Sequence, residues 1–252
     1  MTPDPTVRLE AALLPARLAA YEPGEYVGQE SFMRASEIRM LAARAGIGPT
    51  TSVLDVCCGV AGPGRLIARE LCCTYLGVDG CAEAIAVARR RGPENCRFEV
   101  SHVPPLPAGQ FDVVLLLETM LAFADKATLA RAVSAALAPG GRFAFTVEEG
   151  HPLTEAERAL MPAADTVWPM TREQLVCCLG TAGLRVRWQS DCTKAHQATV
   201  DSLVNAFVAH ADWIRDQVPD TVLDELLVAH RLWGEWLRRG RIRKFLVVAE
   251  RG

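Results

Sequence analysis

The sequence lacks an apolar run long enough to cross a membrane. Its longest apolar stretch, residues 113–124, is interrupted by Glu118 and Thr119, whereas a helical span needs about 20 consecutive apolar residues. The first residues are acidic early and lack the apolar core of a signal peptide. We therefore expect a cytosolic protein that does not insert into membranes.

An excess of basic charge is also missing. The 27 Lys and Arg residues are outnumbered by 30 Asp and Glu residues, which gives a net charge of −3 and a pI near 6.0. This balance argues against nucleic acids and anionic membrane surfaces as partners. One local exception is RRGRIRK at 238–244, which we interpret as a helix end with arginines in solvent. The alternative is a site for an anionic substrate group.

No Cys-x-x-Cys pair and no Cys/His group with zinc-finger spacing occurs, although the chain has nine cysteines. Six of them form adjacent doublets, and adjacent residues in a strand or helix point in different directions. We expect reduced, mostly buried cysteines that behave as small apolar residues, and no metal site.

What the sequence does contain is a regular alternation of short apolar strands and helical segments. Parallel strands joined by helices form a sheet that is covered on both faces. The predicted strands are 52–57, 75–79, 96–100, 111–118, 142–148, 184–190 and 244–251, and the predicted helices are 1–20, 31–46, 65–72, 82–91, 126–137, 171–183, 197–216 and 220–238. Ser31 and Thr171 are the expected N-caps of two of these helices. Because a long helical excursion precedes the last strand, we expect that strand to be antiparallel.

The length of 252 residues suits one α/β domain. Within 1–252 we predict an N-terminal lid segment (1–30), a cofactor-binding core (31–148), two substrate lid inserts (149–170 and 191–240) and a final strand (241–252).

The strongest motif is VLDVCCGVAGPG at 53–64, a strand that runs into a glycine-rich turn and a helix. Small residues there let the backbone approach a ligand and present N–H groups at a helix N-terminus. Asp79, which follows Gly59 by twenty residues, is placed to bind both hydroxyls of a ribose. By themselves these features fit NAD about as well as S-adenosylmethionine.

Two features favour S-adenosylmethionine. Asp55 lies before the glycines, where its charge would repel a pyrophosphate but attract an ammonium or a sulfonium group. The sequence also has LAPGGRF at 137–143, a turn before a strand, and no Tyr-x-x-x-Lys pair for hydride transfer.

The order VLDVCCG, LGVD, SHVPPLP, FDVV, LAPGGRF resembles the class I S-adenosylmethionine-dependent methyltransferases over residues 52–148. The resemblance implies a Rossmann-like three-layer α/β sandwich with a seven-stranded, mostly parallel sheet, an antiparallel last strand and a helical lid. It also implies contacts of Asp55 and Gly59 with the methionine end and of Asp79 with the ribose. The other cofactor contacts that it implies are Cys57 and Ala61 in place of motif glycines, Gly64, Gly80 beside the adenine, and Ser101 and His102 at its amino edge.

The stretch 111–125 is similar to the amine-directed members, such as the phosphoethanolamine and the sarcosine/dimethylglycine methyltransferases. Glu118 takes their acidic position and is implied to contact cofactor and acceptor, but Ala122 stands where those enzymes have a histidine. The segment 21–31 resembles their aromatic entry segment. It implies that Tyr21 or Tyr26 closes the site and that Gln29 and Ser31 lie near the cofactor.

His196 follows the sixth strand and is a candidate general base, since the pKa of histidine lies near neutrality. Four tryptophans are candidates for an apolar pocket: Trp168, Trp213, Trp233 and Trp236. Together these features predict methyl transfer to a small molecule, to nitrogen rather than oxygen, by a monomer or homodimer. The alternatives are a non-methylating cyclisation or rearrangement on the same fold, and a regulatory module that binds the cofactor without turnover.

Overall fold

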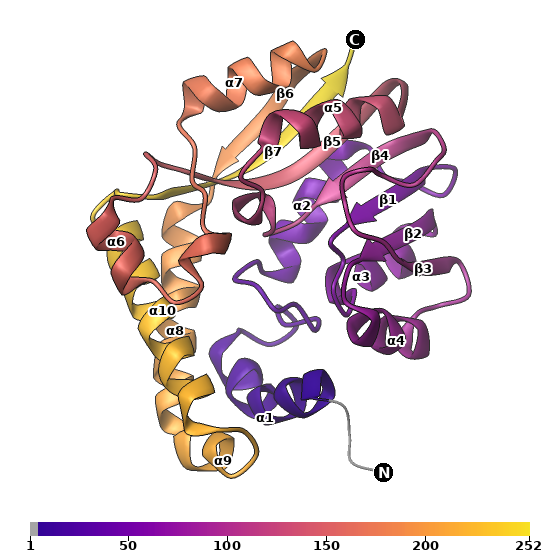
Figure 1. Ribbon diagram of the computed structural model, residues 1–252. Helices are drawn as coiled ribbons and strands as arrows, with labels where there is room; N and C mark the ends of the chain where they lie inside the picture. The colour runs from indigo at the N-terminus through magenta and orange to yellow at the C-terminus, as the bar shows by residue number, and fades with distance from the viewer. Residues whose placement is uncertain (1–4) are drawn as a thin grey trace.

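A computed structural model describes residues 5–252, with side chains from residue 8 onward. Its centre is a seven-stranded sheet with the order β3-β2-β1-β4-β5-β7-β6 (Figure 1). Every strand runs parallel to the others except β7, which pairs antiparallel with both β5 and β6. The bounds are β1 Ser52–Val56, β2 Thr74–Asp79, β3 Cys96–Val100, β4 Phe111–Leu116, β5 Leu137–Glu149, β6 Leu184–Asp191 and β7 Arg243–Arg251.

Helices connect the strands as the alternation predicts, and Thr171 caps α7 through Gln174 as expected. The helices are α1 Pro5–Ala20, α2 Ala35–Ala45, α3 Gly62–Leu71, α4 Ala82–Arg91, α5 Lys126–Ala136, α6 Glu155–Leu160, α7 Arg172–Thr181, α8 Thr193–Ala209, α9 Ala211–Arg215 and α10 Asp220–Arg238, with short 3-10 turns at Met120–Ala122 and Ala164–Thr166. Within residues 5–252, none of them has both the length and the apolar character needed to span a membrane.

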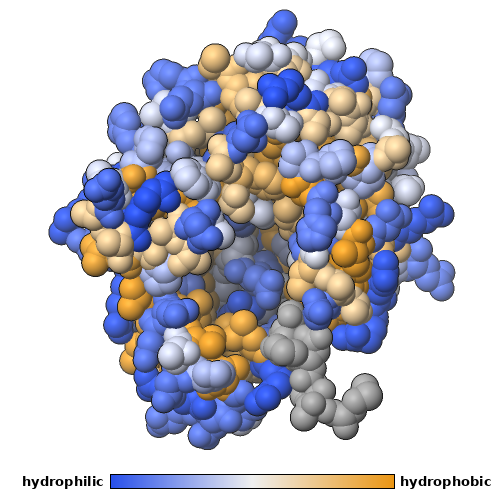
Figure 2. Space-filling view, viewed as in Figure 1, coloured by the Kyte–Doolittle hydropathy of each residue, from blue (hydrophilic) through white to orange (hydrophobic). Residues whose placement is uncertain are grey.

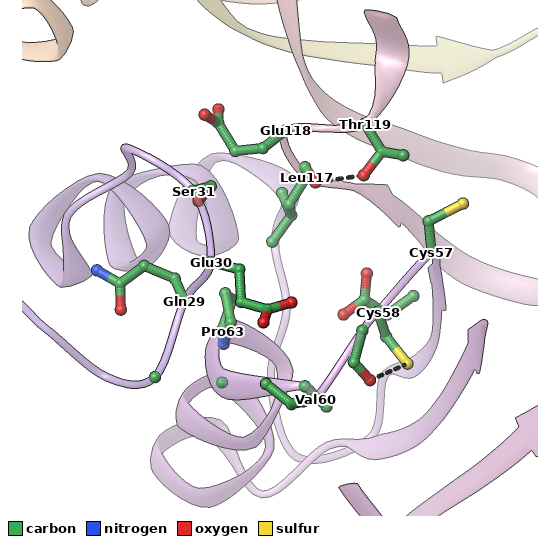
Figure 3. Close-up of a pocket in the computed structure, with 15 residues that line it drawn as sticks. Gln29, Glu30, Ser31, Cys57, Cys58, Val60, Pro63, Leu117, Glu118 and Thr119 are labelled. Carbon is green, nitrogen blue, oxygen red and sulfur yellow. Dashed lines mark hydrogen bonds between the residues drawn. The ribbon is translucent and has the colours of Figure 1, made fainter. Parts of the chain in front are cut away.

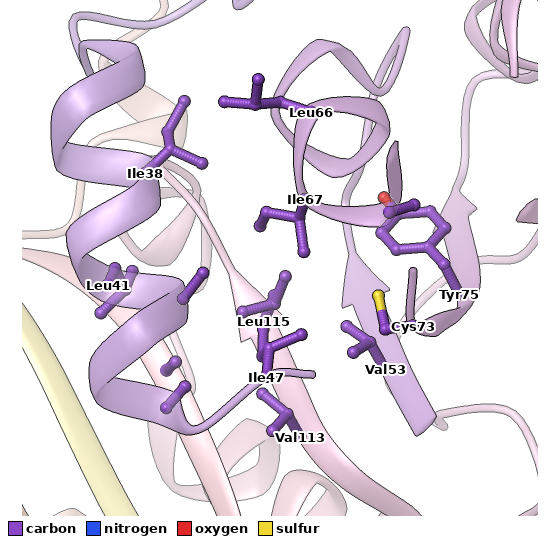
Figure 4. Packing of buried hydrophobic residues seen from close by; sticks show 14 of the residues in the cluster. Ile38, Leu41, Ile47, Val53, Leu66, Ile67, Cys73, Tyr75, Val113 and Leu115 are labelled. Carbon is purple, nitrogen blue, oxygen red and sulfur yellow. The ribbon is translucent and has the colours of Figure 1, made fainter. Parts of the chain in front are cut away.

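The two faces of the sheet carry separate apolar cores, which makes the domain a three-layer sandwich. On one face α2 and α3 meet the strands through side chains such as Ile38, Leu66 and Leu115 (Figure 4). On the other face Leu129 of α5 and Leu179 of α7 belong to a core that includes strand residues such as Phe145. The sheet is thus buried on both sides, as its continuous apolar strands require.

A further apolar core lies outside the sandwich, where α1, α8, α9 and α10 pack together beyond the carboxyl ends of the strands (Figure 1). It joins Leu13 and Ala16 of α1 to Leu203 and Phe207 of α8 and to Leu223 of α10. The N-terminal helix and the helices of the 191–240 insert therefore share one core, and their role as a lid stays a prediction. The first four residues of the predicted lid segment lie outside the described residues.

Several predicted boundaries are wrong. Arg34, not Ser31, is the N-cap of α2, because the Glu37 carboxylate accepts the Arg34 N–H and completes a capping box there. The helix expected at 197–216 begins at Thr193 and ends at Ala209, before the separate α9. The strand expected to reach Glu118 ends at Leu116.

Candidate active site

The site lies at the carboxyl ends of β1 and β4, where the strand order reverses, which is the usual binding position in open α/β sheets. Two cavities meet there. The glycine-turn pocket has a volume of about 170 Å³ and is lined by residues 28–31, 55, 57–63 and 117–119 (Figure 3). Figure 2 shows the hollow between the lid and the end of the sheet, with hydrophilic residues inside it and apolar residues around it.

The backbone of the turn adopts the left-handed conformation at three positions: Cys57 (φ 59°), Gly59 (φ 54°) and Ala61 (φ 57°). Only Gly59 adopts it without steric cost. Gly62 is required for another reason, because a Cβ there would lie 2.3 Å from the Gly28 carbonyl oxygen. The N-terminal loop thus lies directly on the start of α3.

Asp55 is buried at the floor of the pocket and accepts a 2.5 Å hydrogen bond from the Tyr75 hydroxyl. Burial raises the pKa of Asp55 to about 7, although the Tyr75 hydrogen bond opposes the rise. Gly64 makes room for this hydroxyl, since a Cβ there would lie 1.8 Å from it. No cationic side chain among the described residues pairs with Asp55. A ligand that brings its own cation therefore fits this floor.

Asp79 is the last residue of β2, and its side chain holds the glycine-rich turn after β1 in place. Its carboxylate accepts the Gly59 N–H at 2.9 Å and the Cys81 N–H at 2.8 Å. His102 is exposed and lies against Gly80, where a Cβ would be 2.9 Å from its Nδ1 atom. The residues predicted to flank an adenine are therefore neighbours in space, and their contacts with a cofactor stay a prediction.

The predicted entry segment forms the opposite wall. The Gln29 amide points away from the pocket (Figure 3) and organises its own loop by bonding to Val27, Glu25 and Met33. The Tyr21 hydroxyl donates a 2.6 Å bond to the Ser31 carbonyl, and the Tyr26 ring packs 5.5 Å from that of Tyr21. Burial raises the pKa values of both tyrosines. Both are protonated at neutral pH, and Tyr21 braces the loop that carries Ser31.

The second cavity, the lid cavity, has a volume of about 240 Å³ and lies between the sheet, the N-terminal loop, α10 and the 149–170 insert. Its walls are mostly apolar and include Phe32, Leu121, Met161 and Trp233. Glu118 and Glu148 supply carboxylates at the ends of β4 and β5. Of the predicted tryptophans, Trp233 lines this cavity and Trp213 is exposed.

Glu118 belongs to both cavities, as do Glu30 and Ser31. It follows the end of β4 with φ 60°, and its N–H donates a 2.6 Å bond to the Thr146 hydroxyl. A left-handed non-glycine residue is strained, and such strain is concentrated at functional sites. The strained turn directs the Glu118 side chain toward the lid rather than along the strand.

Behind Glu118 lies a buried charged group that we call the carboxylate–lysine cluster: Glu118, Glu148, His196 and Lys244. Lys244 Nζ is 2.6 Å from Glu118 Oε1 and also forms an ion pair with Glu148. His196 Nε2 lies 3.5 Å from Glu118 Oε2. The cluster therefore gathers residues from β4, β5, α8 and β7 around one ammonium group.

The charges within this cluster follow from burial and proximity. Burial lowers the pKa of Lys244, but the two carboxylates raise it more, so its pKa lies above its usual value. Burial and the Lys244 charge hold the pKa of His196 well below its usual value. His196 is thus neutral and behind Glu118 rather than in either cavity wall. Its role as a base stays a prediction.

Glu118, Glu148 and His196 are also close enough together to hold a metal ion. The Lys244 ammonium, however, stands between the two carboxylates, so the cluster already contains a cation.

The basic run 238–244 is not a solvated helix end throughout, and that prediction is wrong for Lys244, which is fully buried. Its arginines form ion pairs at the surface, such as Arg241 with Glu157 at 2.7 Å and Arg243 with Asp191 at 2.7 Å. The sequence interpretation missed Lys244, Glu148 and Glu30. The available signal was a charged residue near the end of an apolar strand, with Glu148 near the end of β5 and Lys244 near the start of β7.

Comparison with known proteins supports the sequence resemblance over the core. Residues 54–145 match the family model described as "Methyltransferase domain". The chain is 32% identical over 97 residues to 2-methyl-6-phytyl-1,4-hydroquinone methyltransferase of a Synechocystis strain, which covers 37% of this chain and 30% of that protein. It is also 32% identical over 112 residues to methyltransferase GfsG of Streptomyces halstedii, with 42% and 40% covered. The chain thus spans well under half the length of both relatives.

Solved structures with the same fold match almost the whole chain. The cyclopropane synthase MmaA2 from Mycobacterium tuberculosis has a TM-score of 0.78 at 14% identity, covering 97% of this chain and 94% of that one. The [4+2]-cyclase SpnF has a TM-score of 0.74 at 17% identity, covering 98% and 94%.

The narrower likeness to amine-directed enzymes is not confirmed, because the similar proteins include a cyclopropane synthase and a hydroquinone methyltransferase. The fold class predicted from the sequence is confirmed, and the binding of S-adenosylmethionine stays a prediction. Over residues 54–145 the chain is therefore similar to a methyltransferase domain.

Proposed function

We propose that this chain transfers the methyl group of S-adenosylmethionine to a small molecule held in the lid cavity, and to nitrogen in preference to oxygen. The observation that supports this is the position of Glu118, which lines both cavities. A donor in the glycine-turn pocket and an acceptor in the lid cavity would meet beside this carboxylate. S-adenosylmethionine supplies a methyl group on a positively charged sulfur, which any well-placed lone pair can displace.

The residues of the glycine-turn pocket fit this cofactor. Asp55 is a buried acid without a cationic partner in the described chain and suits the ammonium of the methionine end. Asp79 retains lone pairs for ribose hydroxyls beyond the two backbone bonds that it accepts. Gly59 and Gly62 let the loop approach the ligand closely.

The lid cavity indicates the class of acceptor. Its apolar walls favour a molecule with a hydrocarbon or aromatic body. Its three carboxylates, from Glu30, Glu118 and Glu148, favour a group that donates hydrogen bonds or carries positive charge. A basic amine on an apolar body has both properties. A mostly apolar cavity and a net charge of −3 suit a metabolite, including a secondary metabolite, better than a nucleic acid.

A turnover assay tests the proposal. The protein is incubated with S-adenosylmethionine and a panel of apolar amines, phenols and alcohols, and S-adenosylhomocysteine and the methylated products are measured. We expect products from amines first. Tight cofactor binding without product across the panel would favour the second candidate, a cyclisation or rearrangement in the lid cavity that does not consume the cofactor. The likeness in fold to a [4+2]-cyclase motivates including such substrates.

Glu118→Gln provides the residue-level test. Loss of the carboxylate should lower kcat/KM about 100-fold, the typical contribution of a well-placed acid–base or orienting group. Glu149→Gln is a matched control, because Glu149 adjoins Glu148 on β5 and its side chain lies on the other side of the sheet. Equal activity of the Glu118 variant and the control would contradict the role proposed for Glu118.

A further inference from the structure

The carboxylate–lysine cluster contains more acidic groups than basic ones. It contains two carboxylates, one ammonium and a neutral imidazole. Lys244 pairs with both carboxylates, so the formal charges of the cluster add up to one net negative charge.

This charge lies where the two cavities meet. Glu118 lines the glycine-turn pocket and the lid cavity, and Glu148 lines the lid cavity. Lys244 is on the far side of both carboxylates and lines neither cavity among those described, as its full burial requires. A ligand at the junction therefore meets the negative groups, while the compensating positive charge is behind them.

We propose, resting on the function proposed above, that this cluster distinguishes the charged cofactor from its neutral product. During transfer the lone pair of the acceptor forms a bond to the methyl carbon. The carbon–sulfur bond breaks and its electron pair stays on sulfur, so the sulfonium becomes a neutral thioether. The positive charge moves to the acceptor, and an amine acceptor later releases it as a proton.

Before transfer, the net negative charge attracts the sulfonium at the junction of the cavities. After transfer this attraction to the sulfur is gone, although the remaining contacts of the nucleoside and the amino acid are unchanged. The cluster thus favours S-adenosylmethionine over S-adenosylhomocysteine and promotes release of the product. Lys244 acts as a positioning residue, which fixes the charge of the cluster without touching the cofactor.

Binding measurements test this without an acceptor. The dissociation constants of S-adenosylmethionine, sinefungin and S-adenosylhomocysteine are measured by calorimetry for the wild type, Glu148→Gln and Glu148→Asp. Sinefungin carries an amine in place of the sulfonium and is therefore also cationic. Glu148→Gln leaves one carboxylate and one ammonium, so the cluster becomes neutral.

We expect Glu148→Gln to lower the ratio of the S-adenosylhomocysteine constant to the S-adenosylmethionine constant by about three- to tenfold, with sinefungin following S-adenosylmethionine. Glu148→Asp keeps the charge and should keep the ratio, as should the control Glu149→Gln. Glu118→Gln also neutralises the cluster and provides a second variant in case Glu148→Gln does not fold.

Two results separate this inference from the proposed function. If all three ligands weaken equally in Glu148→Gln, the cluster is structural and the charge selection is wrong, whatever the turnover assay shows. If the wild type binds none of the three ligands, the proposed function fails at the cofactor, and the inference fails with it. A lowered ratio in a protein that never methylates would support the inference alone.

Discussion

Two buried acidic centres lie beside the position where the cavities meet: Asp55, and the pair of Glu118 and Glu148. They differ in what balances the negative charge of the buried carboxylates. Asp55 has a hydroxyl for a partner and no counter-ion within the described chain, so burial raises its pKa to about 7. Glu118 and Glu148 share an internal ammonium from Lys244. The first centre needs a cation from a ligand, whereas the second is supplied with one by the fold.

The two centres also differ in how they affect the stability of the ligand-free protein. Because burial raises the pKa of Asp55 to about 7, this carboxyl lowers the free energy of unfolding as the pH rises from the unfolded-chain pKa to about 7, and the loss is constant above that. A buried ion pair stabilises little overall, but removing one partner leaves an uncompensated charge in the interior. Breaking the second centre should therefore have the larger effect on stability.

Lys244→Met tests that expectation. It leaves two buried carboxylates with no cation, so the free energy of unfolding should fall by about 3–5 kcal/mol. Urea denaturation at pH 8, where proton uptake is least able to compensate, is the suitable measurement. Lys194→Met is the matched control, because Lys194 is exposed on α8 and should change the free energy of unfolding by about 0.5 kcal/mol or less. If the free energy of unfolding of Lys244→Met falls by less than about 1 kcal/mol, the Lys244 charge is not needed to balance the two carboxylates.

Gly64→Ala disturbs the first centre by packing rather than by charge. The added Cβ would lie 1.8 Å from the Tyr75 hydroxyl and would displace it from Asp55. Overpacking of this kind should destabilise the protein by about 1–3 kcal/mol. Gly180→Ala in α7 has no atom within 4 Å of the new Cβ and should stabilise it by about 0.5–1 kcal/mol. Equal midpoints for the two variants in thermal unfolding would mean that the Tyr75 hydroxyl moves aside freely.

The two centres also differ in how far the sequence revealed them. Asp55, Gly59 and Asp79 lie within 25 residues, on two consecutive strands and the turn after the first. Their spacing follows from local geometry, so the pattern predicted a site for a nucleoside cofactor, and Asp55 favoured S-adenosylmethionine over NAD. The strands were found for the same reason, since an apolar run between turns determines its own structure.

The cluster, in contrast, draws on residues separated by up to 126 positions, from Glu118 to Lys244. Its formation depends on β7 entering the sheet beside β5 with Lys244 opposite Glu148. That register comes from tertiary packing, which no single-sequence pattern encodes. Lys244 followed a run of arginines and so was interpreted as a surface residue, and Glu118 was predicted without the ammonium that balances it.

The smallest expected effect concerns the pH dependence of cofactor affinity at the first centre. A cationic ligand favours the ionised form of Asp55, so binding below pH 7 must displace a proton. Affinity for S-adenosylmethionine should therefore rise with pH up to about 7 and then level off, by about tenfold between pH 6 and pH 7.5. Calorimetry in two buffers with different ionisation enthalpies measures both the affinity and the proton released.

Two variants set the limits of this prediction. Tyr75→Phe removes the hydrogen bond that lowers the pKa of Asp55, so the rise in affinity should shift to higher pH. Asp55→Asn cannot titrate and should bind weakly at every pH. It should also unfold less readily than the wild type at pH 8, by about 1–3 kcal/mol, because it no longer buries an unbalanced charge there. If the wild-type affinity is independent of pH while Asp55→Asn binds normally, the cation of the ligand lies elsewhere. Glu30, which also lines the glycine-turn pocket, would then be the acid that the cationic group of the ligand contacts.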